Sequence, residues 1–119
     1  MITTEIFLQD VEYGVPSGNY DGSSLDWNSD AEQGPGYYLG HSGQQTFTLR
    51  LTAFTGQLTI QGTLDSDPEH ANWVTVYDLT DTDVSTYFSI ERTASFVWLR
   101  VRVQDFDAGT INQVDVVYP

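Results

Sequence analysis

The chain lacks cysteine and lysine entirely, and its few positive charges are four arginines among 119 residues. Without cysteine it can form neither a disulfide framework nor a thiolate zinc site. No apolar stretch approaches the ~20 residues that a membrane-crossing helix needs. The N-terminal segment has no basic region, and its longest apolar run is residues 6–8. We therefore expect synthesis in the cytoplasm without a signal peptide.

Negative charge dominates the composition. Seventeen acids face four arginines, which gives a formal net charge of −13. A surface of this sign repels nucleic-acid backbones and anionic lipid heads, so we expect neither a nucleic acid nor a membrane as a partner. Solubility or a saline setting is the preferred explanation, ahead of the recruitment of divalent cations.

The pattern of apolar residues predicts strands. Helical periodicity is nearly absent, whereas 14 threonines and a period-two alternation, as in Phe47, Leu49 and Leu51, favour β-structure. We expect one all-β domain over residues 1–119, an antiparallel β-sandwich or jelly roll of about eight strands. The expected strands are residues 2–8, 10–14, 45–53, 57–64, 73–79, 86–91, 95–104 and 111–118.

Turn chemistry separates these expected strands. Residues 54–56 and 108–110 each predict a tight antiparallel turn, and residues 65–69 contain a proline that suits a turn. Residues 16–43 form instead a long polar loop region that carries several aromatic side chains. Loops of that length are uncommon in compact domains and are often functional.

Two stretches resemble known families. The run LTIQGTLD, followed by a short turn and NWVTV, resembles discoidin and carbohydrate-binding jelly rolls of the galactose-binding-like kind. FVWLRVRV with GTINQVDVVY resembles their final pair of strands. A narrower likeness joins TAFTGQLTIQGTLDSDPEHANWVTV with FVWLRVRVQDFDAGTINQV, which together look like small virion structural proteins of tailed, marine or cyanobacterial myovirus-type phages. It covers residues 45–118 well and the first 44 residues loosely.

The phage resemblance implies a non-enzymatic structural or decoration protein of a capsid or tail, located in the virion. It implies self-association or other virion proteins as partners, and it transfers no catalytic residue. We expect the subunit contact on a face formed by Phe96, Trp98, Arg100 and Arg102, because aromatic and Arg side chains are enriched at interfaces. The alternative for Trp98 is the core between the sheets, where we also expect Trp73.

The alternative function is a carbohydrate-binding module or a host-glycan-contacting domain. Sugars stack on exposed Trp and Tyr rings while polar neighbours bond their hydroxyls. Trp27, Tyr37, Tyr38 and His41 lie in the polar region beside Asp and Asn, so they are the expected ligand-binding residues. The competing interpretation is that Trp27 and Tyr37 cap one end of the sandwich core.

Catalytic chemistry is not expected from this chain. Its two histidines, His41 and His70, lie in loop-like segments, and no G-x-S-x-G elbow is present. Asp65, Asp67 and Glu69 alternate and could offer oxygen ligands to a structural calcium ion, but they do not complete an EF-hand loop. An acidic turn is the preferred interpretation, and we expect no cofactor and no catalytic metal.

Overall fold

The computed structural model describes residues 3–37, 44–93 and 96–118, with the backbone alone for Thr3, Tyr37 and residues 81–93. Its elements are β1 (Thr3–Glu12), β2 (Trp27–Asn28), β3 (Glu32–Gln33), the 3-10 helix η1 (Pro35–Tyr37), β4 (Gln44–Thr63), β5 (Val74–Thr93) and β6 (Trp98–Tyr118). All strand pairs are antiparallel, in the order β1-β6-β4-β5, with β2 and β3 paired to β6. Within the described ranges, no helix is long and apolar enough to span a membrane.

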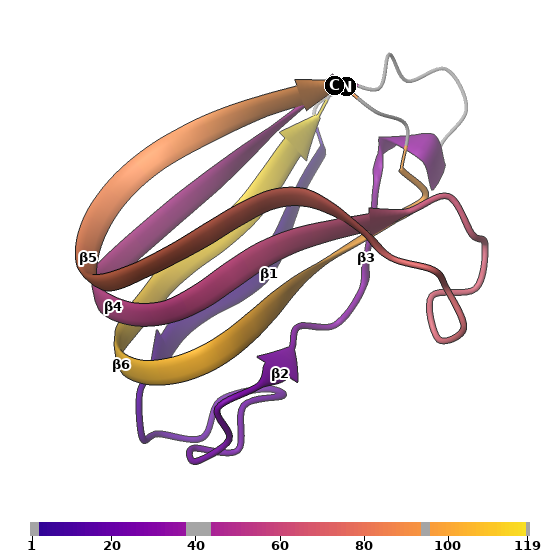
Figure 1. Cartoon of the computed structure of the whole chain (residues 1–119). Coiled ribbons are helices and arrows are strands. Elements are labelled where there is room, and N and C mark those ends of the chain that lie inside the picture. Colours follow the sequence, from indigo (N-terminus) through magenta and orange to yellow (C-terminus); the bar gives the residue numbers. More distant parts are fainter. Residues whose placement is uncertain (1–2, 38–43, 94–95, 119) are drawn as a thin grey trace.

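The three longest strands bend sharply, and each contributes to two layers (Figure 1). The first layer contains β1, the second half of β6, the first half of β4 and the second half of β5. The second layer contains β2 with β3, the first half of β6, the second half of β4 and the first half of β5. This is an antiparallel β-sandwich with the strand order of a jelly roll, so the expected fold class is confirmed.

Bulges at the bends change which residues face the core. Ala53 in β4 and Asp105 in β6 both have a φ of 51°, a left-handed conformation that is uncommon outside glycine. Buried apolar side chains of β4 occupy odd positions before Ala53, as at Leu49, and even positions after it, as at Leu58. One inserted residue therefore keeps apolar side chains inside on both sides of the bend.

The expected turns at residues 54–56 and 108–110 were wrong, because both segments lie inside continuous strands. Gly56 and Gly109 have positive φ values of 150° and 93° and bend β4 and β6 without reversing the chain. The count of eight strands is not confirmed either. The described residues contain six strands. The eight expected strands join in pairs into the four long strands β1, β4, β5 and β6, and the two short strands β2 and β3 were not expected.

An aromatic cluster closes the core beside the bends of β4 and β6. The ring centroid of Phe106 lies 5.0 Å from that of Tyr20, 5.8 Å from that of Phe54 and 6.1 Å from that of Trp27. Tyr20 is fully buried, and its hydroxyl accepts the N–H of Gly14 at 2.9 Å. Part of the polar region 16–43 is therefore packed into the core, and β2, β3 and η1 also lie within that region.

Candidate functional site

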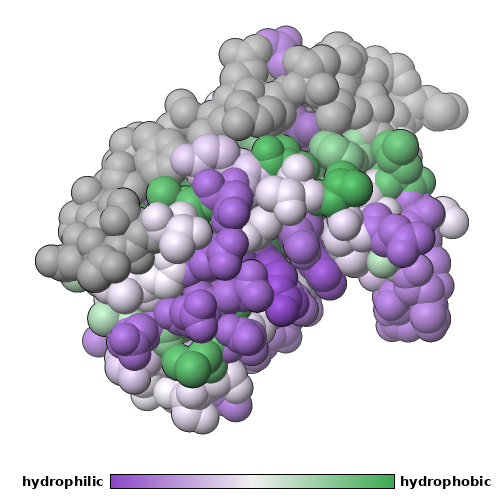
Figure 2. Space-filling model, in the orientation of Figure 1, coloured by the Kyte–Doolittle hydropathy of each residue, from purple (hydrophilic) through white to green (hydrophobic). Residues whose placement is uncertain are grey.

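The outer side of the second layer brings several polar, charged and aromatic side chains within contact distance. Along β6, the buried side chains of Leu99 and Val101 alternate with the half-buried side chains of Trp98, Arg100 and Arg102, which point outward. A band of hydrophilic residues crosses the visible surface over this layer (Figure 2). The residues of this side, called the polar face below, are Asn28, Gln57, Thr59, Gln61, Trp73, Asp78, Trp98, Arg100 and Arg102.

Arg100 is fixed in the polar face by two contacts. Its Nε donates to Gln61 Oε1 on the neighbouring strand β4 at 2.7 Å. Its guanidinium carbon lies 4.3 Å from the ring centroid of Trp73, a cation–π arrangement. Partial burial, followed by the positive charge of Arg102, lowers the pKa of Arg100 from its ordinary value. The side chain is thus held across β4, and several of its N–H donors have no partner among the residues that the structure describes.

Arg102 and Asp78 lie in one row of the polar face, on either side of Thr59. Arg102 Nη1 donates to Asn28 Oδ1 at 3.3 Å. Asp78 accepts hydrogen bonds from Gln57 Nε2 at 2.9 and 3.1 Å and from Thr59 Oγ1 at 3.0 Å. Each charge is therefore bound by neutral groups, and the positive and negative parts of the face stay separate.

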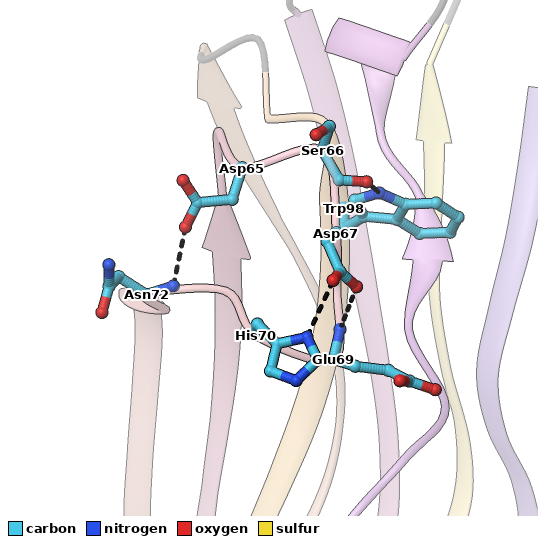
Figure 3. A network of polar contacts seen from close by, with 7 residues as sticks. All are labelled: Asp65, Ser66, Asp67, Glu69, His70, Asn72 and Trp98. Atoms are coloured by element: carbon cyan, nitrogen blue, oxygen red, sulfur yellow. Dashed lines mark hydrogen bonds and ion pairs between the residues drawn. The ribbon is translucent and has the colours of Figure 1, made fainter.

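The loop between β4 and β5 supports the tryptophan end of the polar face (Figure 3). Trp98 Nε1 donates to the carbonyl oxygen of Ser66 at 3.1 Å. Asp65 Oδ2 accepts the backbone N–H of Asn72 at 2.7 Å, which ties the two ends of the loop together. The loop and the indole of Trp98 therefore hold each other in position.

Three exposed residues at the tip of this loop, Asp67, Glu69 and His70, could bring ligand atoms within 4.8 Å of one another. Asp67 is already engaged within the loop, because it accepts the N–H of Glu69 at 3.0 Å and lies 2.8 Å from His70 Nδ1. The bond to His70, followed by that to the Glu69 N–H, lowers the pKa of Asp67. Asp65 and Asp67 each accept a backbone N–H of the loop, so both act as turn-capping groups, as expected of an acidic turn.

An open pocket of about 400 Å³ adjoins the opposite end of the polar face. It lies at the bends of β4 and β6. Its lining residues are Leu25, Thr55, Gly56, Gln57, Thr80, Asp105 and Asp107. Gln57 belongs to both the pocket and the polar face, so the two surfaces are continuous.

Of the four residues expected to bind a ligand, the described structure places the side chain of Trp27 alone. Trp27 is only 7% exposed and packs against Tyr20, because the pairing of β2 with β6 turns its ring into the core. Its ring therefore offers no open stacking surface, in agreement with the core-cap alternative. Tyr37 lies in η1 with its backbone alone described, and Tyr38 and His41 lie outside the described residues.

Of the four residues expected to share an interface, Phe96 alone does not lie on the polar face. It precedes β6 and packs against the core over Gly62, whose added Cβ would come within 2.6 Å of its ring. Strand alternation cannot be extended back to Phe96, because the strand begins at Trp98. Trp73 also differs from expectation, since it lies half-buried against Arg100 on the outer side rather than in the core.

The polar residues of β4 were not singled out from the sequence. Gln57 and Gln61 alternate with the buried Leu58 and Ile60, so the period-two pattern already placed them on the side away from the core. Their meeting with Arg100 depends on the register between β4 and β6, which alternation alone does not give.

No protein-family model matches the chain, and no curated protein is significantly similar to it. One similar solved structure contains the CBM22-1 and GH10 modules of the Clostridium thermocellum endo-1,4-β-D-xylanase 10B with xylohexaose, at a TM-score of 0.50 and 14% identity. It aligns with 99% of this chain, which spans 26% of that longer chain. Another is chitosan-binding module 1 from a chitosanase/glucanase of Paenibacillus sp. IK-5, at a TM-score of 0.49, 25% identity and coverage of 100% and 94%. The likeness to the xylanase structure is one of fold.

Proposed function

We propose that the domain is a non-enzymatic carbohydrate-binding module whose site is the polar face. The observation that carries this proposal is the close placement of planar hydrogen-bonding groups and tryptophan rings on one open sheet surface. Amide and guanidinium groups can bond sugar hydroxyls, and tryptophan rings pack against the C–H faces of sugars. Gln61, Arg100 and Trp73 show this combination at contact distance.

The side chains of the polar face are already ordered before a ligand arrives. Arg100, Arg102 and Trp98 are tied to β4, β2 and the β4–β5 loop, respectively. A ligand therefore loses less binding free energy to the ordering of these side chains. The pocket at Gln57 extends the surface toward the bends, which gives an extended sugar chain room along the strands.

Binding without catalysis agrees with the acids of the polar face. Glycoside hydrolysis needs two carboxyl groups that flank the scissile bond. Among the described residues of the face, Asp78 is the one acid, and it already accepts hydrogen bonds from Gln57 and Thr59. The two other acids near the proposed sugar path, Asp105 and Asp107, line the adjoining pocket from a single strand, β6. The xylanase structure with a similar fold is described with a CBM22 module and a xylohexaose ligand, which supports the proposal at the level of architecture.

A glycan array followed by calorimetry on the bound sugars tests this proposal. We expect Trp73→Ala to weaken binding about tenfold or more, equivalent to about 1.4 kcal/mol, because it removes a ring from the polar face. Trp73→Phe should retain most of the affinity, since it keeps an aromatic surface. Thermal unfolding of each variant checks that the fold is intact. Absence of binding to every neutral and acidic oligosaccharide tested, or parental affinity in Trp73→Ala, would reject the proposal.

Assembly into a phage particle is our second proposal, and it uses the same surface. It rests on the sequence resemblance and on Trp98, Arg100 and Arg102, a tryptophan and two arginines on an open sheet face. Sedimentation velocity at rising protein concentration measures self-association directly. Association that Trp98→Ala abolishes and that bound sugar competes with would assign the face to assembly, whereas a monomer at all concentrations would count against it.

A further inference from the structure

The polar face concentrates positive charge in a strongly acidic chain. Arg100 and Arg102 are two of the four arginines in a chain that has no lysine and 17 acids. Both point to the same side of β6, with Cα atoms about 6.6 Å apart at the usual rise of a strand. Among the described residues, neither guanidinium forms an ion pair, and their hydrogen bonds go to the neutral side chains of Gln61 and Asn28.

Two features of this arrangement oppose the positive charge of Arg100. Two like charges on one strand face repel each other, and the partial burial of Arg100 removes some of its hydration. Both effects lower the pKa of Arg100, with burial as the larger cause. The cation–π contact with Trp73 compensates in part.

An acid lies nearby but does not neutralise the pair. Asp78 is in the same row as Arg102, two strand spacings or about 9.6 Å away, with Thr59 between them. Its carboxylate accepts hydrogen bonds from Gln57 and Thr59 instead. An arginine has five N–H donors, and only one from each side chain is used among the described residues. The unused donors form a ready site for an oxyanion, for which the Arg fork is suited.

We propose, on the basis of the carbohydrate-binding function proposed above, that Arg100 and Arg102 recognise an isolated anionic group, a carboxylate or a sulfate, on an otherwise neutral glycan. The anionic group binds between the two guanidinium groups, and a neighbouring neutral sugar packs against the tryptophan end of the face. The preference is for sparse charge because the molecule carries a net charge of −13 and the adjoining pocket is lined by Asp105 and Asp107. A densely charged polyanion would be repelled by these surroundings.

Matched pairs of ligands that differ only in the anionic group test the proposal. The first pair is xylotriose bearing one glucuronate branch and the same oligosaccharide after reduction of the carboxylate to an alcohol. The second pair is neocarrabiose 4-O-sulfate and the unsulfated disaccharide. Calorimetry is carried out at 0.15 M salt, where the Debye length of about 8 Å screens the distant acids.

The variants are Arg100→Gln and Arg102→Gln, with Arg50→Gln as a control. Arg50 is an exposed arginine in the first layer, so its replacement makes the same change in net charge away from the polar face. We expect the acidic member of at least one pair to bind about tenfold or more tightly than its neutral partner. Each polar-face variant should remove that preference, and Arg50→Gln should keep it.

The outcomes separate the two proposals. A preference that depends on Arg100 and Arg102 supports both, and the pair that shows it identifies the anion as carboxylate or sulfate. Equal affinity for acidic and neutral members overturns the anion proposal but leaves the carbohydrate-binding proposal intact. A preference that Arg50→Gln also removes reflects net charge alone and likewise overturns it. Absence of binding to all four ligands and to the glycan array overturns both.

Discussion

Trp27 has a buried indole N–H with no hydrogen-bond partner among the described residues. A buried donor without a partner destabilises the fold by about 1–3 kcal/mol. The packing of the Trp27 ring against Tyr20 and Phe106 must stabilise the fold by more than this amount. We expect Trp27→Ala to lower the free energy of unfolding by about 3–5 kcal/mol. Trp27→Phe should lower it far less, because it keeps a ring and removes the unmet donor. Urea unfolding followed by circular dichroism measures both changes.

Trp73 supplies the matched control for this prediction. It lies half-buried on the polar face, so Trp73→Ala should cost much less stability than Trp27→Ala. Equal losses in the two variants would contradict the core position of Trp27. So would a Trp27→Ala protein that keeps parental stability but loses sugar binding, which is the behaviour of an exposed stacking platform.

Glu32 in β3 is a half-buried acid close to the carboxyl groups of Glu5 and Asp30. Burial, followed by these negative charges, raises its pKa above the ordinary value of 4.5. The folded protein therefore holds this proton more tightly than the unfolded chain, and stability falls as the pH rises from 4.5 through the folded-state pKa. We expect Glu32→Gln to raise the free energy of unfolding at pH 7 and to change it little at pH 4.

Urea unfolding at both pH values measures the effect of Glu32→Gln. The control is Glu12→Gln, the same change in charge at an exposed position of β1. Any general benefit from removing one negative charge appears in both variants, so the difference between them reports the surroundings of Glu32. A gain no larger than that of Glu12→Gln at pH 7 would contradict the raised pKa.

At the scale of the strands, the bends of β4 and β6 depend on glycine. Gly109 has a φ of 93°, and an added Cβ would collide with the carbonyl oxygen of Ala53 on the neighbouring strand. Gly14 has a similar φ of 85° but nothing within 4 Å of its added Cβ. Both substitutions by alanine carry the backbone strain of about 1–2 kcal/mol, and only the one at Gly109 adds the collision.

We therefore expect Gly109→Ala to lower the free energy of unfolding by at least about 2 kcal/mol more than Gly14→Ala does. Denaturant unfolding of the two variants gives the difference directly. Similar losses would show that backbone strain alone destabilises Gly109→Ala. They would also show that β4 and β6 can separate at the bend with little loss of unfolding free energy.

The half-strands could be predicted because each has its own apolar alternation, as in Phe47, Leu49 and Leu51. Their continuity could not be predicted, because bulges and turns use the same glycine and aspartate residues. A bulge keeps a strand continuous where the partner strand bends at the same place. Whether this happens depends on the two paired strands together and not on one segment of sequence.

The same limit applies to the candidate site. Alternation placed Arg100 and Arg102 on one face, but it could not show that Gln61 and Asp78 come to that face from other strands. The polar neighbours of Trp27 suggested exposure, whereas its pairing with β6 buries it. Cross-strand register and loop packing determine these positions, and neither can be predicted from a local stretch of sequence.

The whole molecule carries a large excess of negative charge for its size. The net charge is −13 and the radius of gyration is 13.8 Å. At 0.01 M salt the Debye length of about 30 Å exceeds this radius, so every acid repels every other across the domain. At 0.15 M it is about 8 Å, and only neighbouring charges interact. The electric field of the acids at Arg100 and Arg102 is therefore screened least at low salt.

This field predicts that the thermal unfolding midpoint rises by a few degrees when NaCl is increased from 0.01 to 0.15 M at pH 7. Screening relieves a repulsion that is stronger in the folded protein than in the expanded unfolded chain. The rise should shrink as the pH approaches the sequence pI of about 4.1, where the net charge disappears. A midpoint that falls with salt at pH 7 would mean that local attractions, rather than the net repulsion, dominate the electrostatics of the fold.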